Sequence, residues 1–109
     1  MNDVDLATEA QSLAGLVEYQ PGSVVSRSLL NKSTGTITLF AFDAGQSLSE
    51  HSTPHDALVL GIDGELEIRI DGDPRRLKSG YVLLMPADKP HAIEALTRSK
   101  MVLVMIREP

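Results

Sequence analysis

Over most of the chain, apolar and polar residues alternate with a period close to two, which is the spacing of a β-strand with one buried face. Residues 65–70 show this most clearly, because Leu66, Ile68 and Ile70 alternate with charged residues. Residues 57–62 instead form an almost unbroken apolar run, which is typical of a strand that is covered on both faces. The pattern therefore predicts that the chain is built mainly of β-strands.

Short segments of this kind recur along the chain and are separated by turns that contain glycine. The strongest turn signals are Asp63-Gly64 and Asp71-Gly72, because Asp-Gly dipeptides favour tight hairpins. The predicted strands cover residues 23–30, 36–42, 57–62, 65–70, 75–78, 81–85, 91–95 and 100–106. Roughly eight to ten short strands without long crossover helices predict an all-β sandwich or barrel of antiparallel strands.

The first 22 residues do not share this pattern. Residues 5–11 favour one or two helical turns, for which Asp3 or Asp5 would be the cap, and Gly15 limits any extension. The expected organisation is a short irregular or helical arm over residues 1–22, followed by one β-barrel domain over residues 23–109. Two roles of the arm stay open: a mobile segment, or a clip that crosses to a partner subunit and makes a dimer by strand exchange.

Composition and charge narrow the classes of function. Of the 109 residues, 42% are hydrophobic and 23% are charged, which is typical of a single globular domain. The net charge of −5 argues against nucleic-acid binding, and no apolar run approaches the roughly 20 residues of a membrane-spanning helix. The chain has no cysteine and its acidic start lacks the order of a secretory signal, so we expect a cytoplasmic location.

The three histidines are the strongest candidates for chemistry. His51 and His55 lie in one segment, and His91 lies 36 residues beyond His55. Imidazole is the commonest protein ligand of transition metals, and it titrates near neutral pH. In a small barrel, all three rings could be directed at one interior point. The direction of His55 stays open, because Pro54 interrupts regular strand pairing beside it.

The order of glycine, proline and histidine residues resembles the two sequence motifs of the cupin superfamily. The residues that match these motifs at the expected spacing are Gly45, His51, Gly64, Gly80, Pro86 and His91. The match extends from about residue 36 to residue 106 and is closest to the small single-domain bacterial cupins. The resemblance implies a jelly-roll barrel (a double-stranded β-helix) of two antiparallel sheets, with an interior pocket and often a homodimer.

Three positions depart from the pattern of that family. Thr53 stands where the resemblance implies a second metal-binding histidine, and Ala57 stands where it implies a glutamate. Asp88 replaces the glycine of the second motif. His51 and His91 are then the only two of the four usual ligands, and two imidazoles alone hold a divalent metal weakly. His55 would restore a third ligand if it pointed inward, and the expected cofactor is a Zn, Ni, Fe, Mn or Cu ion.

Three functions remain open from the sequence. The first is a module that binds a small organic ligand in a mostly apolar pocket, with His51 and His91 as its few polar groups. The residues expected to line this pocket are Phe40, Phe42, Thr53, Ala57 and Met85. The second is a metal-dependent enzyme of the dioxygenase, isomerase or decarboxylase class, and the third is an interaction role through the arm. We favour the binding module, because positions 53 and 57 lack the usual metal ligands.

Overall fold

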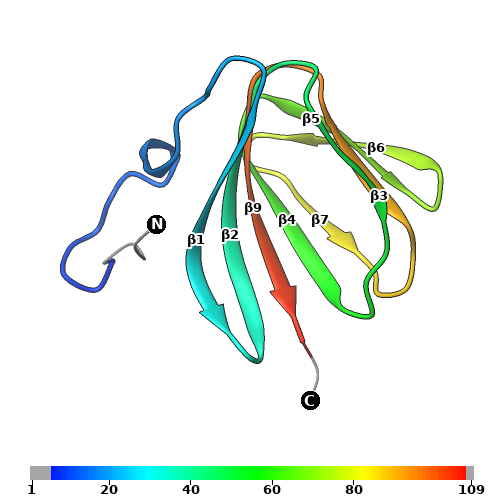
Figure 1. The fold of residues 1–109 in the computed structure, drawn as a ribbon, viewed down its shortest axis with the longest axis horizontal. Coiled ribbons are helices and arrows are strands. Elements are labelled where there is room, and N and C mark those ends of the chain that lie inside the picture. Colours follow the sequence, from blue (N-terminus) through cyan, green and yellow to red (C-terminus); the bar gives the residue numbers. More distant parts are fainter. Residues whose placement is uncertain (1–5, 108–109) are drawn as a thin grey trace.

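The computed structural model describes residues 6–107, which form nine β-strands and one short 3-10 helix (Figure 1). The helix, η1, covers Ala14–Leu16. The strands are β1 (Val24–Lys32), β2 (Gly35–Phe42), β3 (Ser47–His51), β4 (Asp56–Asp63), β5 (Glu65–Ile70), β6 (Asp73–Lys78), β7 (Val82–Met85), β8 (His91–Ala95) and β9 (Ser99–Ile106). Within the described residues, no helix is long and apolar enough to cross a membrane.

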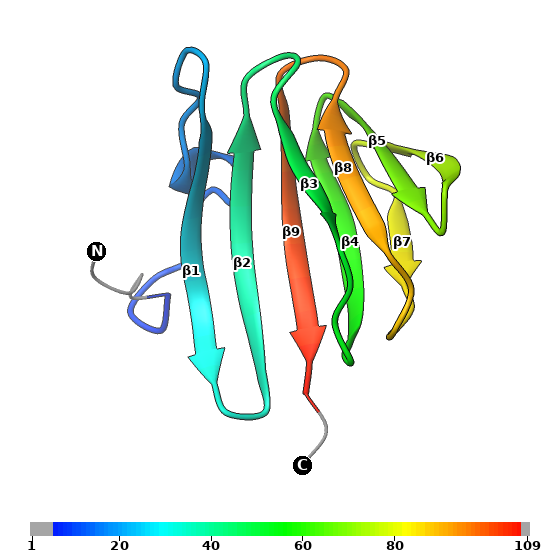
Figure 2. The same ribbon diagram turned by 45° about the vertical axis from the view of Figure 1, so that its right-hand side comes forward.

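Two antiparallel sheets lie face to face, as Figures 1 and 2 show. The larger sheet has the strand order β1-β2-β9-β4-β7, and the smaller sheet has the order β3-β8-β5-β6. The last strand of the chain, β9, therefore lies between β2 and β4 in the middle of the larger sheet. The all-β fold of two antiparallel sheets predicted from the sequence is confirmed.

A hydrophobic core fills the space between the sheets. Leu66 and Ile68 of β5 point inward and are at most 1% exposed, as the alternation along that strand predicted. The buried members of this core are Phe42, Ala57, Val59, Leu66, Ile68, Leu77, Met85, Ile93, Ala95 and Met101. Every strand except β1 and β3 contributes at least one of these residues, so the core joins the two sheets into one unit.

A second apolar cluster covers part of the outer face of the larger sheet. Leu16 and Val17 pack there with Leu39, Ala41 and Val102, so β2 and β9 are buried on both faces. The sequence favoured helical turns over residues 5–11; residue 5 lies outside the described residues, and residues 6–11 form turns and irregular chain. The 3-10 turn lies later because packing on the sheet stabilises the segment around Leu16, which is 7% exposed.

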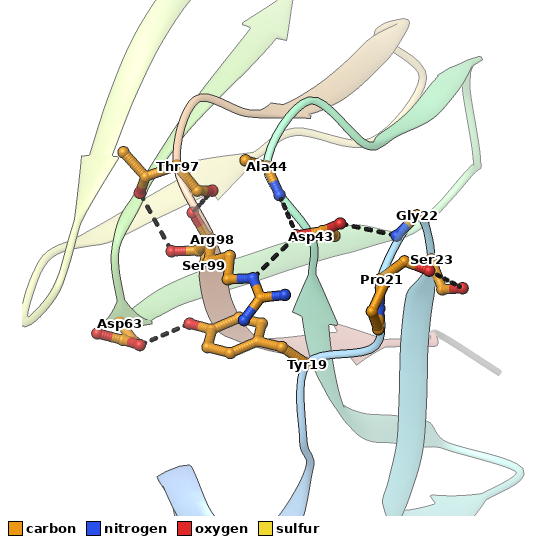
Figure 3. Close-up of polar contacts among 10 residues, drawn as sticks. All are labelled: Tyr19, Pro21, Gly22, Ser23, Asp43, Ala44, Asp63, Thr97, Arg98 and Ser99. Carbon is orange, nitrogen blue, oxygen red and sulfur yellow. Dashed lines mark hydrogen bonds and ion pairs between the residues drawn. The ribbon is translucent and has the colours of Figure 1, made fainter.

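Tyr19 attaches this segment to the barrel (Figure 3). Its hydroxyl donates a hydrogen bond to Asp63 Oδ2 at 2.5 Å. The Lys100 ammonium and the Arg98 guanidinium lie 4.8 Å and 5.4 Å from the centroid of its ring, within the range of cation–π attraction. Burial, followed by the Asp63 carboxylate, raises the pKa of Tyr19, so the hydroxyl remains a donor at neutral pH.

Asp43, just after β2, also attaches the segment before β1 to the barrel (Figure 3). Its carboxylate accepts hydrogen bonds from the Gly22 backbone N–H at 2.7 Å and from Arg98 Nε at 2.9 Å. These two bonds, in that order, lower the pKa of Asp43, so the carboxylate stays ionised at neutral pH. Tyr19 and Gly22 are thus both bonded to the barrel of their own chain.

The hydrophobic pattern of the sequence did not predict β3. This strand reads Ser47, Leu48, Ser49, Glu50 and His51, and only Leu48 among them packs against the core. It lies at the edge of the smaller sheet and pairs only with β8. A strand of this kind lacks the apolar alternation by which a half-buried strand is recognised.

Gly64 forms the turn between β4 and β5 in a conformation that favours glycine. Its φ is +68°, and a Cβ atom at this position would collide with the backbone carbonyl oxygen of Arg98. A side chain would therefore meet both a backbone cost and a steric cost. Gly72, with φ of +82°, has no atom within 4 Å of such a Cβ.

We expect Gly64→Ala to lower the free energy of unfolding by about 2–5 kcal/mol, because a left-handed backbone and an overpacked contact add together. Gly72→Ala is the matched control, and it should lose only the backbone part, about 1–2 kcal/mol. Urea denaturation of both variants gives the comparison. Equal losses of unfolding free energy in the two variants would show that the collision with the Arg98 carbonyl adds no cost.

Candidate functional site

The fold brings His51 and His91 into direct contact, as the sequence predicted. The strands β3 and β8 are neighbours in the smaller sheet (Figure 2). His51 at the end of β3 is opposite His91 at the start of β8 in the ladder that joins them. Their Nε2 atoms are 3.2 Å apart, and the ring centroids are 4.4 Å apart with the planes at 71°. Two imidazoles that are 40 positions apart in the chain thus form one site.

A β-bulge places His51 in this position. The ladder between β3 and β8 starts with Ser47 opposite Glu94 and Leu48 opposite Ile93, and then shifts before His51 meets His91. Without the extra residue, Glu50 would be opposite His91. Bulges commonly redirect a side chain in this way. The register shift therefore decides that an imidazole, and not a carboxylate, faces His91.

The backbone carbonyl of Ser49 favours one tautomer of the His51 ring. The Nδ1 atom of His51 lies 3.0 Å from the Ser49 carbonyl oxygen, which can only accept a hydrogen bond. In the neutral form of the ring, Nδ1 is therefore the nitrogen that carries the proton, and Nε2 presents its lone pair towards His91. Ser49 could not be predicted as part of the site, since its contribution is a backbone carbonyl that leaves no signature in the residue type.

His91 is a buried and incompletely satisfied group. The residue is 6% exposed, and its Nδ1 atom is buried without a hydrogen-bond partner. Burial, followed by repulsion from His51, lowers its pKa, and an interaction with the Lys89 backbone opposes this shift. The ring is therefore neutral at neutral pH, which is the form that binds metals.

Neither neutral form of His91 satisfies both of its nitrogens. With the proton on Nε2, the ring donates to His51 but leaves Nδ1 as a buried acceptor without a donor. With the proton on Nδ1, the Nε2 lone pairs of the two histidines face each other across 3.2 Å. A cation between the two Nε2 atoms would relieve this repulsion, so the pair has the character of a ligand pair.

The structure does not bring His55 into this pair. The Thr53 hydroxyl accepts a hydrogen bond from the His55 backbone N–H at 3.3 Å and lies 3.2 Å from the His55 carbonyl oxygen, which closes a local turn. The residues that line a neighbouring hollow of about 260 Å³ are Pro54, His55, Asp56, Ala87, Asp88 and Ile106. Over residues 6–107, no group of three or more His, Cys, Asp or Glu residues is arranged to hold a metal ion.

The loops around the pair are tied to each other. Asp88, at the position of the motif glycine, has φ of +65°, so the backbone keeps the conformation that a glycine would favour. Its N–H donates to the Thr53 carbonyl at 2.7 Å, and the Ala87 N–H donates to Asp56 Oδ1 at 2.8 Å. These bonds join the β3–β4 loop and the first residue of β4 to the β7–β8 loop, next to the two histidines.

The residues expected to line a pocket lie mainly in packed surroundings. Phe42, Ala57 and Met85 are at most 6% exposed and belong to the core between the sheets. Phe40 is partly buried against that core, and its ring stacks on Phe42 with 6.1 Å between the centroids. Thr53 is partly buried in the β3–β4 loop. Contact between these residues and a ligand stays a prediction.

We expect the metal-free protein to lose stability as the pH falls below about 6.5. Unfolded His91 protonates near that pH, whereas folded His91 has a lower pKa, so the unfolded state binds more protons between the two values. The free energy of unfolding, from urea titrations at several pH values in the presence of a chelator, should therefore decrease on acidification. His91→Gln should flatten this dependence, and the control His55→Gln should leave it as it is. An unchanged slope in His91→Gln would contradict the assignment.

Known proteins are similar to this chain in sequence and in fold. The model of the Cupin domain family matches residues 38–107. A conserved protein of unknown function from Streptococcus pyogenes is 33% identical, with a TM-score of 0.93 over 99% of this chain and 94% of the other. A cupin superfamily protein from Desulfitobacterium hafniense is 34% identical, with a TM-score of 0.88 over 92% of each chain.

A cupin 2 conserved barrel domain protein from Leptotrichia buccalis is 40% identical, with a TM-score of 0.84. The alignment covers 86% of this chain and 46% of the other, so that protein is about twice as long as the matched region. No curated protein matches the sequence. The family match over most of the chain, together with these structural neighbours, shows that the chain belongs to the cupin family.

Proposed function

We propose that this protein binds a small organic ligand at the His51–His91 pair, through a divalent metal ion that the two Nε2 atoms hold weakly. The observation that carries the proposal is the 3.2 Å separation of those two atoms. Metal–nitrogen bonds of about 2.0–2.1 Å separate two imidazole nitrogens on one ion by about 2.8–3.0 Å at octahedral angles and about 3.3–3.4 Å at tetrahedral angles. The pair has that spacing without any rearrangement.

The surroundings of each ring support the same role. Histidines that bind metals usually donate their other ring N–H to a carbonyl or a carboxylate, and the Ser49 carbonyl is placed to accept from Nδ1 of His51. His91 is buried and neutral at neutral pH, so it need not lose a proton to bind. Its unsatisfied Nδ1 would carry the proton once Nε2 is bound to the ion.

A site with two protein ligands is better suited to reversible binding of a metal ion than to holding the ion permanently. Thr53 and Ala57 stand at the positions of the two missing ligands, and neither side chain replaces an imidazole or a carboxylate. When bound, the ion would act as a Lewis acid with several open positions for oxygen or nitrogen atoms of a ligand. Imidazole ligands suit Zn, Ni and Cu better than the harder Mn ion.

Titration calorimetry of the untagged protein with Ni²⁺ or Zn²⁺ tests the metal. We expect micromolar affinity for the native chain and a loss of at least about 30-fold in His51→Ala and in His91→Ala, because a single imidazole holds these ions poorly. The matched control is His55→Ala, which should stay within about twofold because His55 lies outside the pair. A silent titration of the native chain, or an equal loss in His55→Ala, would contradict the proposal.

The ligand is tested separately, with a panel of small carboxylates and phenols. We expect these compounds to protect the native chain against thermal unfolding only when the ion is present, and not in the His91→Ala variant. Protection of equal size in the presence of a chelator would show that the ligand binds without the metal.

A further inference from the structure

The hollow that contains His55 lies outside the core, at the end of the molecule where β9 ends and β4 begins (Figure 2). Asp56 of β4 and Ile106 of β9 both line it, and they are partners in the ladder that joins these strands. Their neighbours Ala57 and Met105 pack in the core between the sheets. Because successive side chains of a strand point to opposite faces, Asp56 and Ile106 point away from the core, and the hollow is separate from the space between the sheets.

Hydrogen bonds hold the walls of this hollow in place. The Ala87 N–H donates to Asp56 Oδ1 at 2.8 Å, and the Asp88 N–H donates to the Thr53 carbonyl at 2.7 Å. The Thr53 hydroxyl accepts a hydrogen bond from the His55 backbone N–H at 3.3 Å. The β3–β4 loop, the start of β4 and the β7–β8 loop are therefore fixed to one another, so the shape of the hollow is formed by the protein itself.

Three polar side chains in the lining have bonding capacity that the rest of the protein leaves unused. Within residues 6–107, the His55 imidazole and the Asp88 carboxylate form no hydrogen bond or ion pair, and Asp56 uses only one of its two carboxylate oxygens. Among the described residues that line the hollow there is no lysine or arginine. The hollow therefore carries two carboxylates without a cation to balance them.

The backbone of Asp88 does not account for an aspartate at this position. Its φ is +65°, a conformation that glycine adopts at lower cost. Aspartate tolerates this region mainly where its carboxylate bonds to the nearby backbone, and the Asp88 carboxylate forms no such bond with the described part of the chain. A ligand that uses the carboxylate would explain the residue.

We propose that the hollow binds the ammonium group of a small organic cation. An alkylammonium group has one positive charge and three N–H donors, which match the carboxylates of Asp56 and Asp88 and the acceptor nitrogen of the His55 ring. Hydrogen bonds between an ammonium and a carboxylate are shorter and stronger than those between neutral groups. The carbon chain of the ligand would lie against Ile106 and Pro54, which are the larger apolar residues of the lining.

An organic cation suits the hollow better than a metal ion does. Over residues 6–107, no group of three or more His, Cys, Asp or Glu residues is arranged to hold a metal ion, so His55, Asp56 and Asp88 are too widely spaced to share one. The volume of about 260 Å³ is below the roughly 300–1,000 Å³ of sites for drug-sized ligands. It equals the share of liquid volume of about nine water molecules, which is enough for a short-chain amine.

An NMR titration of the isotope-labelled full chain tests the site, with a chelator present so that no metal ion contributes. The probe is butylamine, and butanol is the uncharged control of nearly the same shape. We expect butylamine to bind with a dissociation constant on the order of 1 mM and to shift the backbone amide signals of Ala87 and Asp88. Butylamine that binds no more tightly than butanol overturns the proposal.

Two substitutions in the same titration locate the attraction. Asp88→Asn removes one charge and keeps a side chain that tolerates a positive φ, so we expect the chain to fold and to bind butylamine about tenfold more weakly. Asp71→Asn is the matched control, because Asp71 is exposed, has φ of +54° and does not line the hollow. Its affinity should stay within about twofold of the native value. An equal loss in both variants overturns the proposal, since the net charge of the chain would then attract the amine.

The same titration separates this site from the histidine pair and identifies the source of the ammonium group. His51→Ala should bind butylamine as the native chain does, whatever its affinity for metal ions, and a loss of butylamine binding in this variant would contradict a separate site. A short peptide with one lysine carries the same ammonium group on a protein side chain. Tighter binding of the peptide than of butylamine assigns the hollow to a protein lysine, and weaker binding assigns it to a free amine.

Discussion

The burial of β9 on both faces is the constraint on which the structure depends. Met101 on its inner side is fully buried in the core between the sheets, and Val102 on its outer side is 7% exposed under the segment that precedes β1. Burial of side chains of this size contributes about 1.5–3 kcal/mol each. Because β9 pairs with β2 and with β4, this one strand joins both halves of the larger sheet.

The site lies on the other sheet and depends on a smaller feature. β3 contributes only Leu48 to the packing of the core, so its position rests mainly on its ladder with β8. The bulge in that ladder turns His51 towards His91, and the Ser49 carbonyl then orients the ring. A polar edge strand with an irregular register thus holds one of the two histidines, while the regular apolar strands form most of the core.

Much of the fold could be predicted from the sequence, and the exceptions have physical reasons. The alternation in residues 65–70 and the apolar run in residues 57–62 match β5 and β4, because burial on one face or on both leaves a distinct pattern. The missed strand β3 has a mostly polar composition. The helical turns favoured over residues 5–11 gave way to a turn at Ala14–Leu16, because contact with the sheet outweighs weak local propensity.

The sequence by itself determined the β-architecture, the family motifs and the two histidines at the motif positions, since strand periodicity and turn residues act locally. Only the tertiary structure decided which ring nitrogens meet, that His55 lies outside this pair, and that five aliphatic side chains from five strands align on the outer face of the larger sheet. Each of these depends on strand register, and a shift of one residue turns a side chain to the opposite face. Register is set by pairing between distant segments, so it cannot be read from any one of them.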